Sequence, residues 1–188
     1  IDKKDIRALT KVQLRDFFVS QGDQSFRGNQ VYEWLWSKGA HSFEDMTNIS
    51  KATRTMLEEN FVINHIKVDQ MQRSEDGTVK NAVRLHDGLV VESVLIPTNT
   101  RTTACVSSQV GCSLDCNFCA TARLKRMRNL EPAEIYDQVI AIDKESRLYY
   151  NHPLSNIVFM GMGEPLMNYN NVIKAIEMIT SEEGLGMS

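Results

Sequence analysis

The stretch Gly111-Cys112-Ser113-Leu114-Asp115-Cys116-Asn117-Phe118-Cys119 spaces three cysteines as C-x3-C-x2-C, with an aromatic residue directly before the last one. Thiolates this close in sequence can bind one soft metal centre, and they select zinc or an iron–sulfur cluster. A cubane cluster normally takes four cysteines, so three would leave one iron open to another ligand. We therefore expect Cys112, Cys116 and Cys119 to bind a [4Fe-4S] cluster.

A structural zinc site is the alternative interpretation. Such sites are tetrahedral and closed, so the three cysteines would need a fourth ligand, which Cys105 or His152 could supply. Zinc sites usually contain two C-x2-C pairs, whereas this sequence has one, so the spacing favours the cluster. A disulfide-stapled secreted domain is disfavoured, because the sequence has four cysteines and no signal-like N-terminus.

Composition indicates an ordinary globular chain. The 188 residues are 42% hydrophobic, enough for one core or for a small domain with part of a larger one. No apolar run approaches the roughly 20 residues that span a bilayer, so we expect a cytoplasmic protein without a membrane partner. The net charge of −3 argues against a broad non-specific nucleic-acid surface and leaves room for a local basic patch.

The period of the apolar residues changes along the chain. From Thr10 to about Phe61 they recur at helical spacing, which predicts three or four short helices in a small helical domain over residues 1–62. The period becomes two from about Ile66, with turn signals at 75–77 and 86–88. We therefore predict hairpin-linked strands in a connecting region over residues 63–98.

Glu92 is a carboxylate inside the apolar run Leu89–Pro97. A carboxylate that is buried without a partner is costly, so Glu92 either faces water on an edge strand or has a chemical role. The sequence alone leaves both interpretations open.

Arg101–Gln109 is predicted to be a further strand that leads to the cysteine loop. Arg123–Arg128 then has four cations in six residues. These cations could bind phosphate, or they could neutralise the thiolates and solvate the loop, and the sequence favours neither interpretation.

An α/β pattern follows the cysteines. Pro132 begins a predicted helix that ends near Arg147, and Ser155–Met160 is typical of a buried parallel strand. Gly161-Met162-Gly163-Glu164-Pro165 stands at the carboxyl end of that strand, where ligands bind in α/β folds. Val172–Ile179 is predicted to be the next helix.

These motifs together resemble the RlmN/Cfr family of radical S-adenosylmethionine (SAM) RNA methyltransferases. The resemblance rests on Cys105–Cys112, the three loop cysteines, Arg128-Asn129-Leu130 and Gly161–Asn168, together with Val91–Pro97. It implies an α/β fold in which residues 99–188 are the first part of a radical SAM (βα) barrel. It also implies that the helical domain recognises RNA.

The resemblance implies methylation of C2 of adenosine in 23S rRNA and in some tRNAs. Adenine C2 is not nucleophilic, so a direct transfer from SAM would fail and a radical route is needed. In the family, one SAM methylates a cysteine near the C-terminus, and a second SAM, bound to the open iron, is cleaved there to start the radical chemistry. The implied partners are the RNA substrates and an electron donor such as flavodoxin, and the implied state is a monomer.

The resemblance also implies a role for single residues. Glu92 matches the proton acceptor, and Cys105 matches the cysteine that forms a disulfide with the methyl-carrying one. Phe118 matches the aromatic residue beside the adenine of SAM, and Gly163 and Glu164 match positions that bind the amino group of SAM.

Two features depart from the family pattern. Ala122 and Lys125 stand where the family has the glycines of a T-G-x-x-G run. The sequence also ends at Ser188 without a methyl-carrying cysteine, so we expect the N-terminal half of an enzyme that binds a cluster and does not methylate RNA alone. The alternatives are a zinc-stabilised, non-catalytic RNA-binding module, a different radical SAM enzyme, and a Cfr-type methyltransferase that acts on adenine C8.

Overall fold

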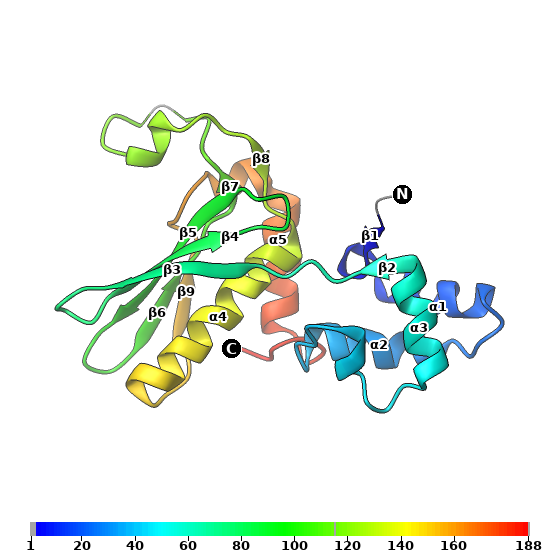
Figure 1. The fold of residues 1–188 in the computed structure, drawn as a ribbon. Helices are drawn as coiled ribbons and strands as arrows, with labels where there is room; N and C mark the ends of the chain where they lie inside the picture. The colour runs from blue at the N-terminus through cyan, green and yellow to red at the C-terminus, as the bar shows by residue number, and fades with distance from the viewer. Residues whose placement is uncertain (1–2, 115, 188) are drawn as a thin grey trace. The chain divides into compact units, whose positions relative to one another are not determined.

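The computed structural model describes residues 3–114 and 116–187. The chain forms two compact units (Figure 1). The first contains the residues up to Asn64 together with those from Glu177 onward, and the second contains His65–Ile176. No helix within the described ranges is both long enough and apolar enough to cross a membrane.

The first unit is mainly helical. Thr10 begins α1 by accepting a hydrogen bond from Gln13, and Ser50 caps α3 through Thr53. These helices bury Phe18, Leu35 and other apolar side chains in one core, which confirms the helices that the spacing predicted. The elements are β1 (Lys4–Asp5), η1 (Ile6–Ala8), α1 (Lys11–Ser20), α2 (Phe26–Trp36), η2 (Phe43–Asp45), α3 (Lys51–Asn60) and β2 (Phe61–Val62).

Gly28 lets α2 approach α1 closely, and this contact supports a prediction. A Cβ atom at Gly28 would lie 2.6 Å from the backbone nitrogen of Arg15 and 2.9 Å from the carbonyl carbon of Leu14. We expect Gly28→Ala to lower the free energy of unfolding by about 2 kcal/mol, because backbone atoms cannot move aside as a side chain can. Helix propensity alone predicts the opposite effect, because replacing glycine by alanine in a helix raises the free energy of unfolding by about 1 kcal/mol.

Urea unfolding measures the effect, with Asn29→Ala as the matched control. Asn29 is the next residue of α2 and is exposed, so its replacement tests helix propensity without a clash. A Gly28→Ala variant as stable as the control would contradict the close helix contact.

The second unit is built on a five-stranded sheet with the order β3-β4-β5-β6-β9. The hairpins close at Gly77 and Gly88, which have positive φ angles of 86° and 83°. The β3–β4, β4–β5 and β5–β6 pairs are antiparallel, as the turn signals predicted for the hairpins, and β6 pairs with β9 in parallel. The strands are β3 (Lys67–Arg73), β4 (Val79–Arg84), β5 (Val90–Pro97), β6 (Thr102–Cys105) and β9 (Asn156–Val158).

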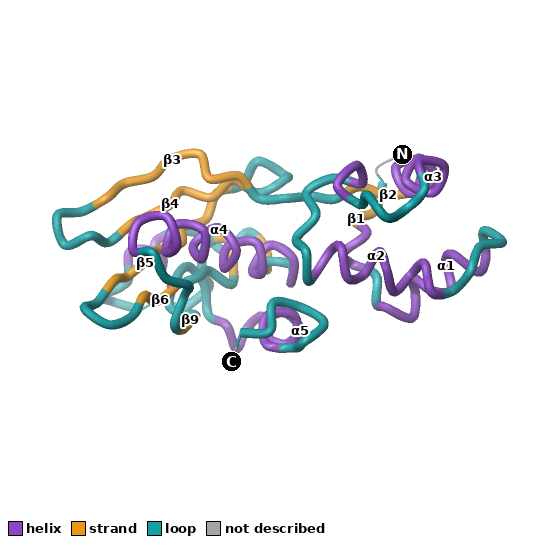
Figure 2. Tube along the Cα trace, turned by 90° about the horizontal axis from the view of Figure 1, so that it is seen from below, coloured by secondary structure: helices purple, strands orange, loops and turns teal. Residues whose placement is uncertain are grey.

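Helix α4 (Pro132–Tyr150) packs against one face of this sheet (Figure 2). Val83, Val91 and Leu95 alternate along β4 and β5 and are fully buried. Asn81 on the same face donates a hydrogen bond to Glu145 of α4, at 2.9 Å. The period-two alternation therefore leaves Glu92 on the opposite face of the sheet.

Two details of the predicted strands were wrong. The parallel strand predicted to be buried, β9, spans only Asn156–Val158 and is at most half-buried, because it lies at the edge of the sheet and pairs on one side only. The single strand predicted over Arg101–Gln109 is divided. β6 ends at Cys105, and β7 (Gln109–Val110) pairs with β8 (Arg128–Asn129) in a separate two-stranded sheet.

The predicted fold class is confirmed: this is an α/β chain with mixed sheets, and the strands within the described ranges do not close into a barrel. Beyond β9, η4 (Pro165–Asn168) leads directly into α5 (Tyr169–Thr180). The short helix η3 (Ala120–Arg123) lies within the cysteine loop.

Candidate functional site

The cysteine loop, residues 111–127, is closed at its base by the β7–β8 pair. The backbone N–H of Cys112 donates to Leu124 at 3.3 Å, and that of Met127 donates to Val110 at 2.9 Å. Gly111 has a φ of 72°, and a side chain there would collide with the carbonyl group of Lys125. The loop can therefore leave the sheet and return only with glycine at this position.

The three thiols lie along the exposed part of this loop. Cys116 is exposed, while Cys112 and Cys119 are half-buried. Hydrogen bonds from the backbone of Ala122 and Thr121 lower the pKa of Cys119, which favours the thiolate form that binds metal. The Cys112 sulfur accepts the N–H of Leu114 at 3.4 Å.

The donor set of the loop suits a soft metal centre, since it consists of thiols with backbone donors around the sulfurs. Within the described ranges, no three His, Cys, Asp or Glu side chains are gathered closely enough to hold a metal. The assignment of Cys112, Cys116 and Cys119 as ligands stays a prediction.

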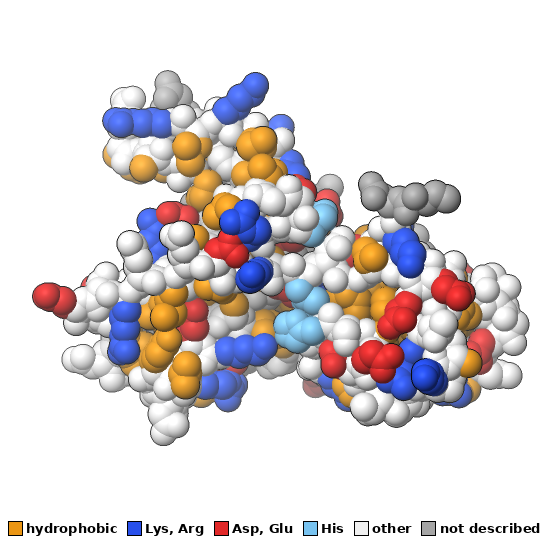
Figure 3. Space-filling view, in the orientation of Figure 1, with side chains coloured by type: hydrophobic (Ala, Val, Ile, Leu, Met, Phe, Trp, Pro, Cys, Tyr) orange, Lys and Arg blue, Asp and Glu red, His pale blue; other side chains and the backbone are white. Residues whose placement is uncertain are grey.

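Phe118 and three cations lie in the same loop as the thiols. Phe118 is 94% exposed. Its position beside the adenine of SAM stays a prediction. Arg123, Lys125 and Arg126 are exposed as well. In the upper part of Figure 3, basic side chains (Lys or Arg) and hydrophobic side chains lie next to one another on this loop.

The fourth cation of the run, Arg128, is already paired. It donates two parallel hydrogen bonds of 2.8 Å to Glu134 and a third, of 2.6 Å, to Asp87. The hydrogen bonds to Glu134 are the main cause of the raised pKa of Arg128. Phosphate binding could therefore involve at most the three exposed cations. Arg128 instead anchors β8, the strand that follows the loop.

A buried polar segment, Ser107-Ser108-Gln109, precedes the loop. The Ser107 hydroxyl donates to the carbonyl of Glu92 at 2.5 Å and accepts the N–H of Met162 at 2.8 Å. Asn168 donates to the carbonyl of Ser108 at 2.8 Å. The 107–109 segment thus links β5, the base of the cysteine loop and the glycine turn after β9.

The sequence analysis included this segment in the Cys105–Cys112 motif but assigned no role to its three polar residues. The available signal was a run of three polar residues between an apolar strand and Gly111. Such a run is unusual in a buried position unless every polar group finds a partner.

The glycine turn, residues 161–165, packs directly on the 107–109 segment. Gly163 has a φ of 91°, and a Cβ atom there would meet the side chain of Gln109. The backbone N–H of Glu164 donates to Gln109, and the Glu164 carboxylate caps η4 by accepting the N–H of Leu166 at 3.0 Å. Close packing against Gln109 therefore requires the second glycine of the G-x-G-E-P motif.

Glu92 and Cys105 share the sheet face that lies opposite α4. Val94 is the direct partner of Cys105, and Glu92 lies two residues before Val94. The Glu92 side chain is half-exposed and forms an ion pair of 2.7 Å with Lys80. Glu92 therefore faces water, but from an interior strand rather than from the edge strand that the sequence had allowed.

Cys105 has a different environment from the loop cysteines. It is buried in β6, and this burial raises the pKa of its thiol, opposed by a hydrogen bond from the backbone of Met160. In the iron-free protein at neutral pH we expect iodoacetamide to alkylate Cys105 at least about ten times more slowly than the exposed Cys116, because the thiolate is the nucleophile.

Peptide mass spectrometry over a time course measures both alkylation rates in one sample. The rate at Cys105 should increase with pH, since a raised pKa leaves little thiolate at neutral pH. The difference should disappear in denaturing urea. Equal rates in the folded protein would contradict the burial of Cys105.

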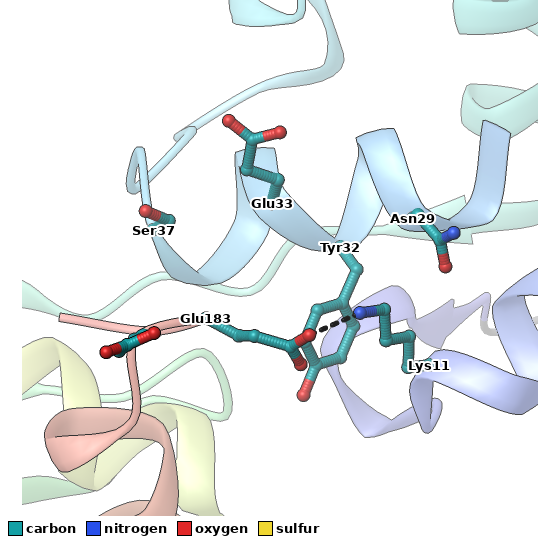
Figure 4. Close-up of a pocket in the computed structure, with 7 residues that line it drawn as sticks. Lys11, Asn29, Tyr32, Glu33, Ser37 and Glu183 are labelled. Carbon is teal, nitrogen blue, oxygen red and sulfur yellow. Dashed lines mark hydrogen bonds and ion pairs between the residues drawn. The ribbon is translucent and has the colours of Figure 1, made fainter. Parts of the chain in front are cut away.

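A pocket of about 340 Å³ lies wholly within the first unit. Figure 4 shows Lys11 and Glu183 paired across it, at 2.5 Å, beside Tyr32. Burial and two nearby glutamates raise the pKa of Tyr32. None of the predicted site residues lines this pocket.

Comparison with known proteins places these features in a class. The model of the radical SAM superfamily matches residues 106–188, which contain the cysteine loop and the glycine turn. A crystal structure of a radical SAM methyltransferase from Sphaerobacter thermophilus superposes with a TM-score of 0.84 and 33% identity. The match covers 98% of this chain and 54% of that one. The chain belongs to the radical SAM superfamily, which uses SAM and a [4Fe-4S] cluster.

The family within this class follows from the first unit and from close relatives. The model of the ribosomal RNA large subunit methyltransferase N-terminal domain, RlmN_N, matches residues 4–63. The whole chain is 89% identical to a probable dual-specificity RNA methyltransferase RlmN from Flavobacterium johnsoniae, and 44% identical to the RlmN of Geotalea uraniireducens. The chain belongs to the RlmN family, and it spans about half the length of these relatives, 54% and 53%.

Proposed function

We propose that the protein containing this chain is a radical SAM methyltransferase that acts on C2 of adenosine in 23S rRNA and in some tRNAs. The observation that carries the proposal is the 107–109 segment, which links three elements that such an enzyme needs. These are the thiol loop, the glycine turn, and the strand of Glu92. The names of the relatives, dual-specificity RNA methyltransferases, support the same substrate class.

In this proposal Cys112, Cys116 and Cys119 would hold the [4Fe-4S] cluster. Together with SAM, the cluster would supply the radical chemistry that an unreactive aromatic carbon requires. Gly163 and Glu164 bind the amino group of SAM, for which the turn offers a carboxylate and backbone carbonyls. Phe118 packs beside the adenine of SAM, a role that its exposure leaves it free to take.

In the proposed reaction the carbon of the methylated cysteine becomes bonded to C2 of the adenine, and Glu92 and Cys105 act on this covalent adduct. Glu92 has a water-facing carboxylate held by Lys80, so it can accept a proton from the methylated base. Cys105 is buried on the same sheet face. Its thiolate would attack the sulfur of the methyl-carrying cysteine, so that a sulfur–sulfur bond forms while the bond from that sulfur to the carbon on the base breaks. The released carbon takes up a proton and becomes the methyl group of the product. That disulfide needs a second, methyl-carrying cysteine, since the four cysteines of this chain already have their roles.

The proposal extends to domains, partners and location. Residues 1–62 recognise RNA, and residues 99–188 form the first part of the radical SAM domain. Residues 63–98 connect these two domains. The protein acts as a monomer in the cytoplasm, where ribosomal and transfer RNA are found, and receives electrons from a flavodoxin-like donor. The match of the RlmN N-terminal model to residues 4–63 supports the first of these assignments.

Anaerobic reconstitution followed by an RNA methylation assay tests the proposed function. The protein containing this chain is incubated with SAM, reductant and unmodified 23S rRNA or tRNA, and the nucleosides are separated by mass spectrometry. We expect 2-methyladenosine. The appearance of 8-methyladenosine would assign Cfr-type specificity instead, and a colourless protein that binds one zinc through four cysteines would overturn the radical mechanism.

A further inference from the structure

Gln109 occupies a central place between the cysteine loop and the glycine turn. Its side chain is buried, with a residue exposure of 1%. Along the chain it lies two residues before Gly111 and three before Cys112. Any displacement of Gln109 therefore moves the base of the loop.

Both ends of the Gln109 amide are used. Its Oε1 accepts the backbone N–H of Glu164 at 3.0 Å, and its Nε2 donates to Oδ1 of Asn129 at 2.8 Å. The backbone N–H of Gln109 also donates to the carbonyl of Met162, at 3.2 Å. One residue of β7 thus bonds to the glycine turn and, through Asn129, to β8 at the base of the loop.

Packing fixes the same arrangement. A Cβ atom built on Gly163 would lie 2.7 Å from Cγ of Gln109 and 2.8 Å from its backbone nitrogen. The turn therefore rests on the stem of the Gln109 side chain with no space for another carbon. The hydrogen bond of the amide and this packing contact therefore both hold the turn against Gln109.

We propose that Gln109 is a positioning residue that sets the place of the Gly163–Glu164 turn relative to the cysteine loop. This inference rests on the proposed function, in which the turn binds the amino group of SAM and the loop binds the cluster. SAM must contact the turn and the cluster at the same time, so the distance between the turn and the loop controls the affinity of the protein for SAM. Without the Gln109 oxygen, the N–H of Glu164 loses its acceptor and the turn loses its register on β7.

Two variants separate this role from general stability. Gln109→Leu keeps the size of the side chain and removes both hydrogen bonds. Gln109→Glu keeps an oxygen at the position that Glu164 contacts, and the amide of Asn129 can rotate to donate to the other oxygen. Asn81→Leu is the matched control, because Asn81 is a fully buried amide of the same unit that bonds to α4 and does not contact the turn.

The variants are made in the protein containing this chain and are reconstituted anaerobically. Iron and sulfide content and the thermal midpoint are measured first. SAM is then titrated while the electron paramagnetic resonance (EPR) spectrum of the reduced cluster is recorded, which gives a dissociation constant per cluster-bearing chain. This readout does not depend on methylation activity.

We expect Gln109→Leu to keep its cluster and to bind SAM at least about tenfold more weakly, the effect of one lost hydrogen bond that leaves its partner unsatisfied. Gln109→Glu should bind SAM within about threefold of the wild type, and Asn81→Leu should bind it as the wild type does. Wild-type affinity in Gln109→Leu, or an equal loss in Gln109→Glu, would overturn the inference.

Failure of the proposed function gives a different result. In that case the wild-type protein itself would hold no cluster, or its EPR spectrum would not respond to SAM, and the positioning role would fall with it. Should Gln109→Leu lose its cluster, Gln109→Asn replaces it. That variant keeps the amide on a side chain shorter by one methylene, so it should lose the contact with Glu164 and show the same weakening.

Discussion

Replacement of Cys112, Cys116 or Cys119 by alanine, one at a time, is expected to abolish the iron–sulfur cluster. Each change removes a thiolate from a set of three, and two thiolates on an exposed loop cannot retain a cubane. Iron and sulfide content after anaerobic reconstitution should fall below about a tenth of the wild-type value, together with the visible absorbance and the EPR signal of the reduced cluster.

Cys105→Ala is the matched control for these variants. Cys105 is buried in β6 and lies outside the loop, so its loss should leave the cluster content unchanged. The comparison discriminates between the two metal sites that the cysteine spacing allows. Loss of the metal in all four variants, in a protein that binds zinc without colour, would show a four-cysteine zinc site and rule out the cluster.

Arg128→Ala is expected to destabilise the second unit by about 3 kcal/mol, the usual effect of removing one partner of a buried ion pair. The Glu134 side chain is only 4% exposed, and Arg128 meets both of its carboxylate oxygens. Glu134 keeps the backbone N–H of Glu131 as a partner but loses its strongest one. The same change frees β8, so the base of the cysteine loop should loosen.

Urea unfolding at neutral pH measures this loss, and two variants calibrate it. Arg128→Lys keeps the positive charge but not the planar fork, so it should fall between the wild type and Arg128→Ala. Arg123→Ala removes an exposed cation of the same run and should change stability by less than about 0.5 kcal/mol. Equal stability of Arg128→Ala and Arg123→Ala would mean that the ion pair contributes nothing.

The pH dependence gives a second test of the same contact. Burial acts to raise the pKa of Asp87, but the hydrogen bonds from Arg128 and Leu89 and the nearby positive charges outweigh it and lower the pKa. A carboxyl group with a depressed pKa stabilises the fold above its unfolded pKa of about 3.9, and this stability is lost as the pH falls through the folded pKa. In Arg128→Ala this acid-dependent loss should shrink, because the folded pKa moves back toward the unfolded value.

Local features of the chain could be predicted from the sequence. The period-two runs and the turns at Gly77 and Gly88 gave the hairpins, because a strand exposes alternate residues and a tight turn needs a positive φ angle. Thr10 and Ser50 begin helices through hydrogen bonds to residues only three positions away. Such features depend on a few neighbouring residues, so the sequence contains them directly.

The partners of polar groups could not be predicted in the same way. Lys80 and Glu92 meet because β4 pairs with β5 in one register, and Arg128 meets Glu134 because β8 leads into α4. The cation run therefore seemed uniform in the sequence, whereas in the structure Arg128 is paired and its three neighbours are exposed. The edge position of β9 likewise depends on which strands flank it.

The sequence by itself determined the chemistry available to this protein: three closely spaced thiols, a G-x-G-E-P turn and the motifs of the RlmN family. Only the tertiary structure decided how these parts are held together, since Gln109 contacts Glu164 across 55 positions of sequence and Ser107 reaches back 15 to Glu92. The physical reason is the sequence distance over which each kind of interaction acts. Spacing and turn propensity act between neighbours, whereas a buried amide finds its partners only after the sheet has formed.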